Sequence, residues 1–160
     1  MKIMKNENMT DKSEKLFIII SILGLLPFII GLLDLLLNKN NLFFLVNIPK
    51  YYGSIIFTFL GAIYWGAMLN LPPKSLIPKK INFFIIIWSV VPSIMGITVL
   101  LIKSNFSLLM LFLGFLLCQL VDEIFNKYFS FPNWYLPLRR ILTLIVVIVL
   151  ICSYFIIQTP

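Results

Sequence analysis

Three residues around the last loop of the chain could carry polar chemistry: Asp122, Tyr135 and Arg139. Asp122 lies near the end of the apolar stretch 106–125, and Tyr135 and Arg139 lie at the start of the next one. Ionisable groups within membrane spans are functional candidates, because inserting one costs about 2.5–3.5 kcal/mol. We expect Asp122 to face inward and to pair with Arg139 or Tyr135. A structural clamp is the preferred interpretation, and a proton or ion relay and an uninformative surface charge are the alternatives.

A second group could line a ligand groove: Tyr64, Trp65, Trp88 and Ser89. Binding sites are lined mainly by apolar and aromatic side chains with a few polar groups. Aromatic residues at helical spacing also serve as packing residues or as anchors at the membrane interface. Packing is the preferred interpretation here, and the groove is the alternative.

The chain lacks the residue sets that enzymes and metal sites use. It has no histidine, and its two cysteines, Cys118 and Cys152, lie in separate apolar stretches. We find no nucleophile–base pair and no glycine-rich phosphate loop. The sequence therefore predicts no catalytic residues, no cofactor and no metal, and the protein is expected not to be an enzyme.

Composition identifies the class of protein that must position these residues. Of the 160 residues, 61% are hydrophobic and 12% are charged. Soluble domains are usually about 45–50% apolar and about 25% charged. The net charge of +7 comes from lysines in loops and tails rather than on one face. This pattern argues against nucleic acid as a partner and indicates an integral membrane protein whose partner is the lipid bilayer.

The hydropathy pattern predicts an all-α bundle of five transmembrane helices. Residues 1–15 are polar and are expected to form a flexible cytosolic tail, and residues 16–157 form the membrane domain. The helices are expected at about 16–37, 51–70, 81–102, 106–125 and 138–157. Pro27 and Pro92 lie within the first and third of these ranges, and each is expected to kink its helix.

The uncharged stretch 51–70 is expected to be the central, protein-packed helix. Ser54, Thr58, Ala62 and Gly66 recur every four residues, and Gly61 lies beside them. Small residues at this spacing let a neighbouring helix approach closely, which drives helix association in lipid. We therefore expect these five residues to form one packing seam.

The distribution of lysine and arginine predicts the orientation. Most of the 13 lie in the N-terminal tail and in the loops on the tail's side, and only Lys39, Lys50 and Lys103 lie on the other side. By the positive-inside rule the N-terminus is cytosolic and the C-terminus lies outside.

Several motifs together resemble a known family. They are LGLLPF (Leu23 to Phe28), YGSIIFTFLGAIYWG (Tyr52 to Gly66), WSVVPS (Trp88 to Ser93), Asp122 and PNWYLPLRRILT (Pro132 to Thr143). In this order they resemble the transmembrane-protein-69-like family, domain of unknown function 3429. The resemblance implies a small five-helix protein of bacterial inner membranes or, in animals, of mitochondria, and it implies no activity. The chain departs from the family pattern at Ala62 and Tyr64, where members typically have glycine and often histidine.

These observations favour a non-catalytic protein of the bacterial inner (cytoplasmic) membrane that acts through helix contacts with partner proteins or with itself. One alternative is a small transporter or channel that uses the proline-containing helices 16–37 and 81–102. Another is an enzyme acting at the lipid interface near the last loop. A cavity lined by Thr58, Tyr64, Trp65, Ser89 and Asp122 would favour transport, and a filled interior would favour the non-catalytic bundle.

Overall fold

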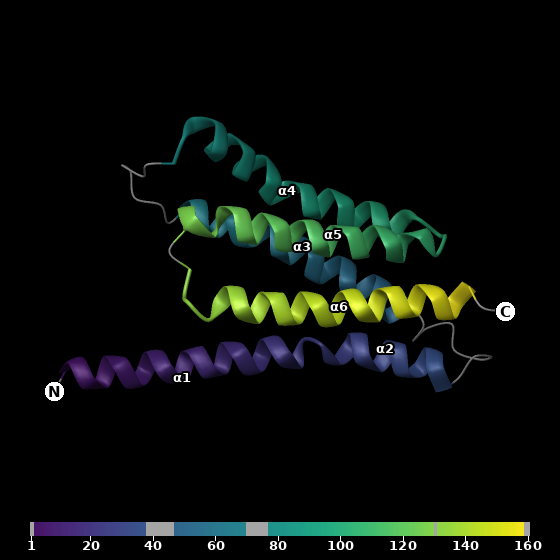
Figure 1. The fold of residues 1–160 in the computed structure, drawn as a ribbon, viewed down its shortest axis with the longest axis horizontal. Helices are drawn as coiled ribbons and strands as arrows, with labels where there is room; N and C mark the ends of the chain where they lie inside the picture. The colour runs from purple at the N-terminus through teal and green to yellow at the C-terminus, as the bar shows by residue number, and fades with distance from the viewer. Residues whose placement is uncertain (1, 38–46, 70–76, 130, 159–160) are drawn as a thin grey trace.

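The apolar stretches of the sequence form long helices that lie side by side (Figure 1). The computed structural model describes residues 2–37, 47–69, 77–129 and 131–158, with side chains described from Lys12 onward. The helices are α1 (Lys2–Leu23), α2 (Leu26–Leu37), α3 (Ile48–Leu69), α4 (Lys79–Leu101), α5 (Phe106–Phe125) and α6 (Tyr135–Gln158), with a 3₁₀ turn η2 (Asn126–Tyr128) after α5. In the described part of the chain there is no strand, which confirms the all-α prediction.

Five helical segments are long and apolar enough to cross a membrane, as predicted. They are Lys12–Leu37, Ile48–Leu69, Lys79–Leu101, Phe106–Tyr128 and Tyr135–Gln158. The start of α1 and the end of α6 lie at opposite ends of the bundle (Figure 1). Large apolar side chains such as Ile55, Phe59 and Leu144 point outward and are exposed, as the surface of a membrane protein requires.

Some helix boundaries differ from the predicted ones. Helix α1 begins at Lys2, so the residues assigned to an N-terminal tail are helical and continuous with the first span. Helix α6 begins at Tyr135 rather than Leu138, and so includes three more residues before the predicted start. The predicted end of the second helix, Asn70, lies outside the described residues.

The two prolines have different effects on their helices. Pro27 has no N–H to donate to the carbonyl of Leu23, and the first span is broken at Gly24 and Leu25, between α1 and α2. The Leu25 N–H donates to the Ile22 carbonyl instead, at 3.0 Å. Pro92, in contrast, lies inside α4, which stays one helix from Lys79 to Leu101.

Helices α3 and α4 are in close contact because each has a glycine that faces the other helix, Gly61 on α3 and Gly96 on α4. A Cβ atom at Gly61 would lie 2.8 Å from the Ser89 carbonyl oxygen, and a Cβ at Gly96 would lie 2.6 Å from Thr58 Oγ1. Ser54 is also buried, and its carbonyl oxygen would lie 3.1 Å from a Cβ atom at Gly96. This contact holds α4 against the side of α3 that includes Ser54, Thr58 and Gly61.

The predicted seam is wrong in its second half, since Ala62 and Gly66 are exposed. Among the described residues, no atom of another element lies within 4 Å of a Cβ built at Gly66. With 3.6 residues per turn, positions four residues apart drift around the helix by about 40° per step. The line of every fourth residue that starts at Ser54 therefore turns away from α4 by Ala62 and Gly66. The contact with α4 continues through Gly61 instead.

The middle of the bundle is filled by apolar side chains, notably Phe28, Phe57, Leu111 and Phe115. The Phe57 and Phe115 rings are 5.6 Å apart, and the Phe57 ring lies over Gly114, where a Cβ would be 2.7 Å from it. A second cluster, which includes Tyr64, Ile85, Val121 and Phe125, packs toward one end of α3, α4 and α5. This second cluster carries the polar site.

Candidate functional site

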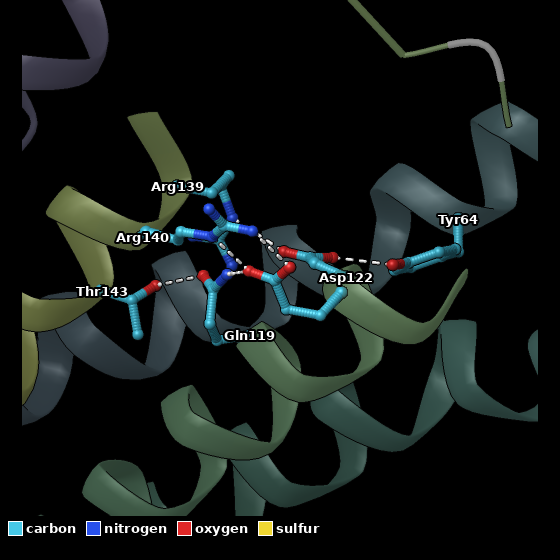
Figure 2. Close-up of polar contacts among 7 residues, drawn as sticks. Tyr64, Gln119, Asp122, Arg139, Arg140 and Thr143 are labelled. Carbon is cyan, nitrogen blue, oxygen red and sulfur yellow. Dashed lines mark hydrogen bonds and ion pairs between the residues drawn. The ribbon is translucent and has the colours of Figure 1, made fainter. Parts of the chain in front are cut away.

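Seven side chains from three helices form a polar network at the end of the bundle where α5 meets α6 (Figure 2). Tyr64 comes from α3, and Gln119, Asp122 and Glu123 come from α5. The α6 helix contributes Arg139, Arg140 and Thr143. Because α5 and α6 are antiparallel neighbours joined by a short connection, the last turns of one face the first turns of the other.

The buried branch of the network is centred on Asp122. The Tyr64 hydroxyl donates a hydrogen bond to Asp122 Oδ1 at 2.7 Å, and Arg139 Nε donates to Asp122 Oδ2 at 2.9 Å. Tyr64 is 1% exposed, Asp122 5% and Arg139 8%. Each carboxylate oxygen therefore has its own donor, and Asp122 links α3 and α6 through α5. The ion pair with Arg139 is one of the two pairings predicted from the sequence.

The outer branch begins at the exposed Glu123 and Arg140 and ends at the buried Thr143. Arg140 donates through Nε and Nη2 to the two carboxylate oxygens of Glu123, at 2.6 and 2.7 Å. Gln119 Nε2 donates to Glu123 Oε1 at 2.9 Å, and Thr143 Oγ1 donates to Gln119 Oε1 at 3.2 Å. Bidentate hydrogen bonds of this kind between arginine and carboxylate fix the relative orientation of the two side chains and strengthen their interaction.

Helical spacing explains why the two branches stay separate. Asp122 and Cys118, four residues apart, share the inward face of α5, and both are buried. Gln119 and Glu123 lie on the next face round, and Glu123 is exposed. On α6, Arg139 and Thr143 share the inward face while Arg140 points outward.

Tyr135 does not bind Asp122, because Tyr64 holds that position. The Tyr135 ring is half-buried and stacks on Phe131, with ring centroids 4.8 Å apart. Within the described part of the chain, the Tyr135 hydroxyl and Arg139 Nη2 are buried without a hydrogen-bond partner. The Tyr64 ring is instead held edge-on against Phe129 at 5.7 Å and Phe131 at 6.5 Å, so that its hydroxyl is aimed at the carboxylate.

The four residues expected to line a ligand groove are not brought together. Tyr64 points inward, whereas its neighbour Trp65 is 55% exposed, because successive helical residues point about 100° apart. Trp88 stacks on Phe84, with ring centroids 6.3 Å apart. The Ser89 hydroxyl donates to the Ile86 carbonyl of its own helix at 2.7 Å. The structure therefore does not form the groove that was the alternative; Tyr64 and Ser89 are buried in the packing, as preferred, whereas Trp65 faces outward.

The hydrogen bonds and ion pairs of this network link the helices α3, α5 and α6 to one another. Two carboxylates and two guanidinium groups are matched one to one, so the network carries no net charge. Among the described residues, no group of three or more His, Cys, Asp and Glu side chains could hold a metal ion. Cys118 and Cys152 are both free thiols.

Sequence reasoning missed the roles of Tyr64, Gln119, Glu123, Arg140 and Thr143 in this network. The four on α5 and α6 left a signal, since polar residues at positions 119 and 123 face polar residues at 140 and 143 across a short loop. Tyr64 left none, because it is 58 residues from Asp122 in the chain.

The fold and site define an all-α protein with five helices of membrane-spanning length and a neutral, self-paired polar network at one end. The chain belongs to the family described as protein of unknown function (DUF3429), which matches residues 13–155. This confirms the family that the motifs indicated. No curated protein and no solved structure matches the chain.

Proposed function

We propose that this protein is a non-catalytic, multi-pass protein of the bacterial cytoplasmic membrane that acts through contacts of its helices with partner membrane proteins or with a second copy. Its N-terminus lies in the cytosol and its C-terminus outside. The observation that carries the proposal is the pairing of Asp122 with Tyr64 and Arg139. These three buried polar side chains bind one another across three helices, so their contribution is to hold the bundle in shape.

The packing of the interior also supports a structural rather than a transporting role. Phe57, Leu111 and Phe115 fill the space between α3 and α5, and each is at most 1% exposed. Thr58, which would line the cavity under the transporter alternative, donates its hydroxyl to the Ser54 carbonyl at 2.8 Å. The Thr58 side chain is thus hydrogen-bonded within its own helix and packed against α4, rather than lining a cavity. This supports a filled interior, as expected of a non-catalytic bundle.

The outward face of α3 supports contact with another helix. Ala62 and Gly66 are exposed on this face, beside Phe59 and Leu69. Small residues between larger ones allow a second helix to come close to the backbone, and close packing is the main attraction between helices in lipid.

Affinity purification of the full chain in mild detergent tests this function. We expect partner proteins or a second copy to co-purify, with the mass of the complex measured by light scattering. Gly66→Leu should reduce the co-purified material, while the matched control Gly66→Ala should retain it. The same purification is repeated after chemical cross-linking of the membranes. A chain that still purifies alone as a monomer would contradict the proposal.

One observation favours the transporter alternative, namely the broken span at Gly24 and Leu25. Interrupted helices build substrate sites in many transporters, because the freed backbone groups bind ions or polar groups. Reconstitution of the full chain in proteoliposomes separates the two functions. Ion or solute flux that Pro27→Ala abolishes would favour transport over the non-catalytic bundle.

The orientation has its own test. Reporters that become active on only one side of the membrane are fused to the N-terminus and to the C-terminus in turn. Because five spans place the two ends on opposite sides, we expect a cytosolic signal from the first fusion and an external signal from the second. Signals from the same side would rule out five crossings.

A further inference from the structure

An aromatic surface lies beside the polar network, where the start of α4 meets the end of α5. We call this set the aromatic face, and it consists of Phe84, Trp88, Phe125 and Tyr128. Phe84 stacks on Trp88 at 6.3 Å and on Phe125 at 5.4 Å, and Phe125 lies 6.1 Å from Tyr128. Phe84 is 46% exposed, and the neighbouring Phe83 is 66% exposed. Trp88 and Tyr128 are half-buried and Phe125 is buried, so the aromatic face reaches the outside of the bundle through Phe84.

Two lysines stand at the edge of the aromatic face. Lys127 Nζ lies 5.1 Å from the centroid of the Tyr128 ring. Lys80 lies one helical turn before Phe84 on the same side of α4, and both lysines are exposed. In the part of the chain for which the structure gives side chains, the ion pairs are Asp122–Arg139 and Glu123–Arg140, and neither includes these lysines.

This leaves a local excess of positive charge that the polar network does not offset. Arg139 and Arg140 are each matched by a carboxylate, so the network adds no net charge. At the other end of the bundle the buried Lys50 donates its amine to the Ile102 carbonyl. The lysines of the aromatic face are thus available to a negative group that approaches from outside.

We propose that Lys80 and Lys127 bind the phosphate of an anionic phospholipid, with an acyl chain lying along Phe84 and Trp88. The inference rests on the membrane location given under the proposed function. A phosphodiester with an uncharged headgroup offers a full negative charge to two ammonium groups. A choline headgroup carries its own positive charge, which would be repelled by the same lysines.

The neighbourhood of the lysines distinguishes a lipid from a soluble anion. Aromatic rings and lysines together are typical of the level of the headgroups, where a ring is half in lipid and an ammonium group reaches the phosphates. The apolar surface continues from Phe84 along the outward side of α4 through Ile87 and Ile94, which are both exposed. An acyl chain can follow this surface, whereas free phosphate would gain nothing from it.

Native mass spectrometry of the full chain, released from detergent micelles, tests the proposal. Phosphatidylglycerol and phosphatidylcholine with identical acyl chains are added at equal concentrations, and the bound fraction of each is measured. We expect phosphatidylglycerol to be preferred. Retention should fall about five-fold for each lysine removed, and so roughly 25-fold for Lys80→Gln with Lys127→Gln.

The matched control is Lys12→Gln with Lys103→Gln, which removes the same charge from exposed lysines elsewhere. It should leave the preference within about two-fold of the original chain, and Lys127→Arg should also retain the lipid. Equal retention of the two lipids, or equal losses in both double variants, would overturn the proposal. Excess inorganic phosphate that displaces the lipid would assign the site to free anions instead.

A separate measurement keeps the membrane location distinct from the lipid site. Alkaline carbonate should leave the full chain in the membrane fraction, and release of the chain would contradict the proposed location. A chain that stays in the membrane but shows no lipid preference would overturn the lipid site alone. Circular dichroism of each variant confirms that loss of lipid does not come from loss of helix.

Discussion

The hydroxyl of Tyr64 and the carboxylate of Asp122 are 58 residues apart in sequence and 2.7 Å apart in space. The bond crosses from α3 to α5, and the second oxygen of the same carboxylate binds Arg139 on α6. Because all three residues are buried, Tyr64 and Arg139 each depend on Asp122 in place of solvent, and Asp122 depends on both. The relative position of three of the helices is therefore set at this end by one carboxylate.

Removal of the tyrosine hydroxyl should weaken this tie without breaking the ion pair. In Tyr64→Phe the ring still fills its place against Phe129, and Asp122 Oδ1 loses its donor. We expect the free energy of unfolding to fall by about 1–2 kcal/mol, measured by denaturation in mixed micelles. Tyr51→Phe is the control, since Tyr51 is exposed. Equal effects in the two variants would contradict a special role for the Tyr64 hydroxyl.

The buried ion pair should show strong coupling between its members. Asp122→Asn and Arg139→Gln each leave one unmatched charge in a buried position, and each should cost about 3–5 kcal/mol. In the double variant both charges are gone, so its loss should be well below the sum of the two single losses. Thermal unfolding of all four proteins completes the cycle, and additive losses would mean that the pair does not act as a unit.

The exposed pair provides the contrast. Glu123→Gln and Arg140→Gln remove partners whose side chains are 33% and 58% exposed, and solvent screens them. Each substitution should cost no more than about 1 kcal/mol. The effect should shrink further as salt concentration rises, while the effect of Asp122→Asn should change little. A larger loss from the exposed pair than from the buried pair would contradict the assignment of the two branches.

Two glycines of α3 should respond in opposite ways to the same substitution. In Gly61→Ala the new methyl group would lie 2.8 Å from the Ser89 carbonyl, so α3 and α4 must move apart at a cost of about 1–3 kcal/mol. Gly66→Ala meets open space and gains helix propensity, so stability should be unchanged or raised by up to about 1 kcal/mol. Unfolding in mixed micelles measures both, and equal losses would refute this contact geometry.

Lys50 should stabilise the end of α4 at the opposite side of the bundle. Its amine binds the carbonyl of Ile102, the residue that caps α4 and whose carbonyl lies beyond the helical hydrogen bonds. Lys50→Met keeps the chain length and removes the donor, so it should cost about 1–2 kcal/mol. Hydrogen exchange at the amides of the last turn of α4 should also accelerate. The exposed Lys103→Met is the control and should leave that exchange unchanged.

The sequence alone was enough to predict the fold class, the five apolar spans and the family. Each of these depends on properties of continuous segments. A run of about twenty apolar residues must become a helix in lipid because its backbone groups have no other partners. The pairing of Asp122 with Arg139 was also within reach, since a short loop forces the end of one span to face the start of the next.

The tertiary structure alone decided which distant surfaces meet. The Asp122 carboxylate binds Tyr64 rather than Tyr135, which is nearer to it in the sequence. On α3, the residues Ala62, Trp65 and Gly66 face away from the contact with α4. Which side of a helix is buried depends on the rotation of the helix about its axis. In a chain whose spans are apolar on every side, composition does not encode that rotation, and only the packing of Gly61, Gly96 and Phe57 against their neighbours determines it.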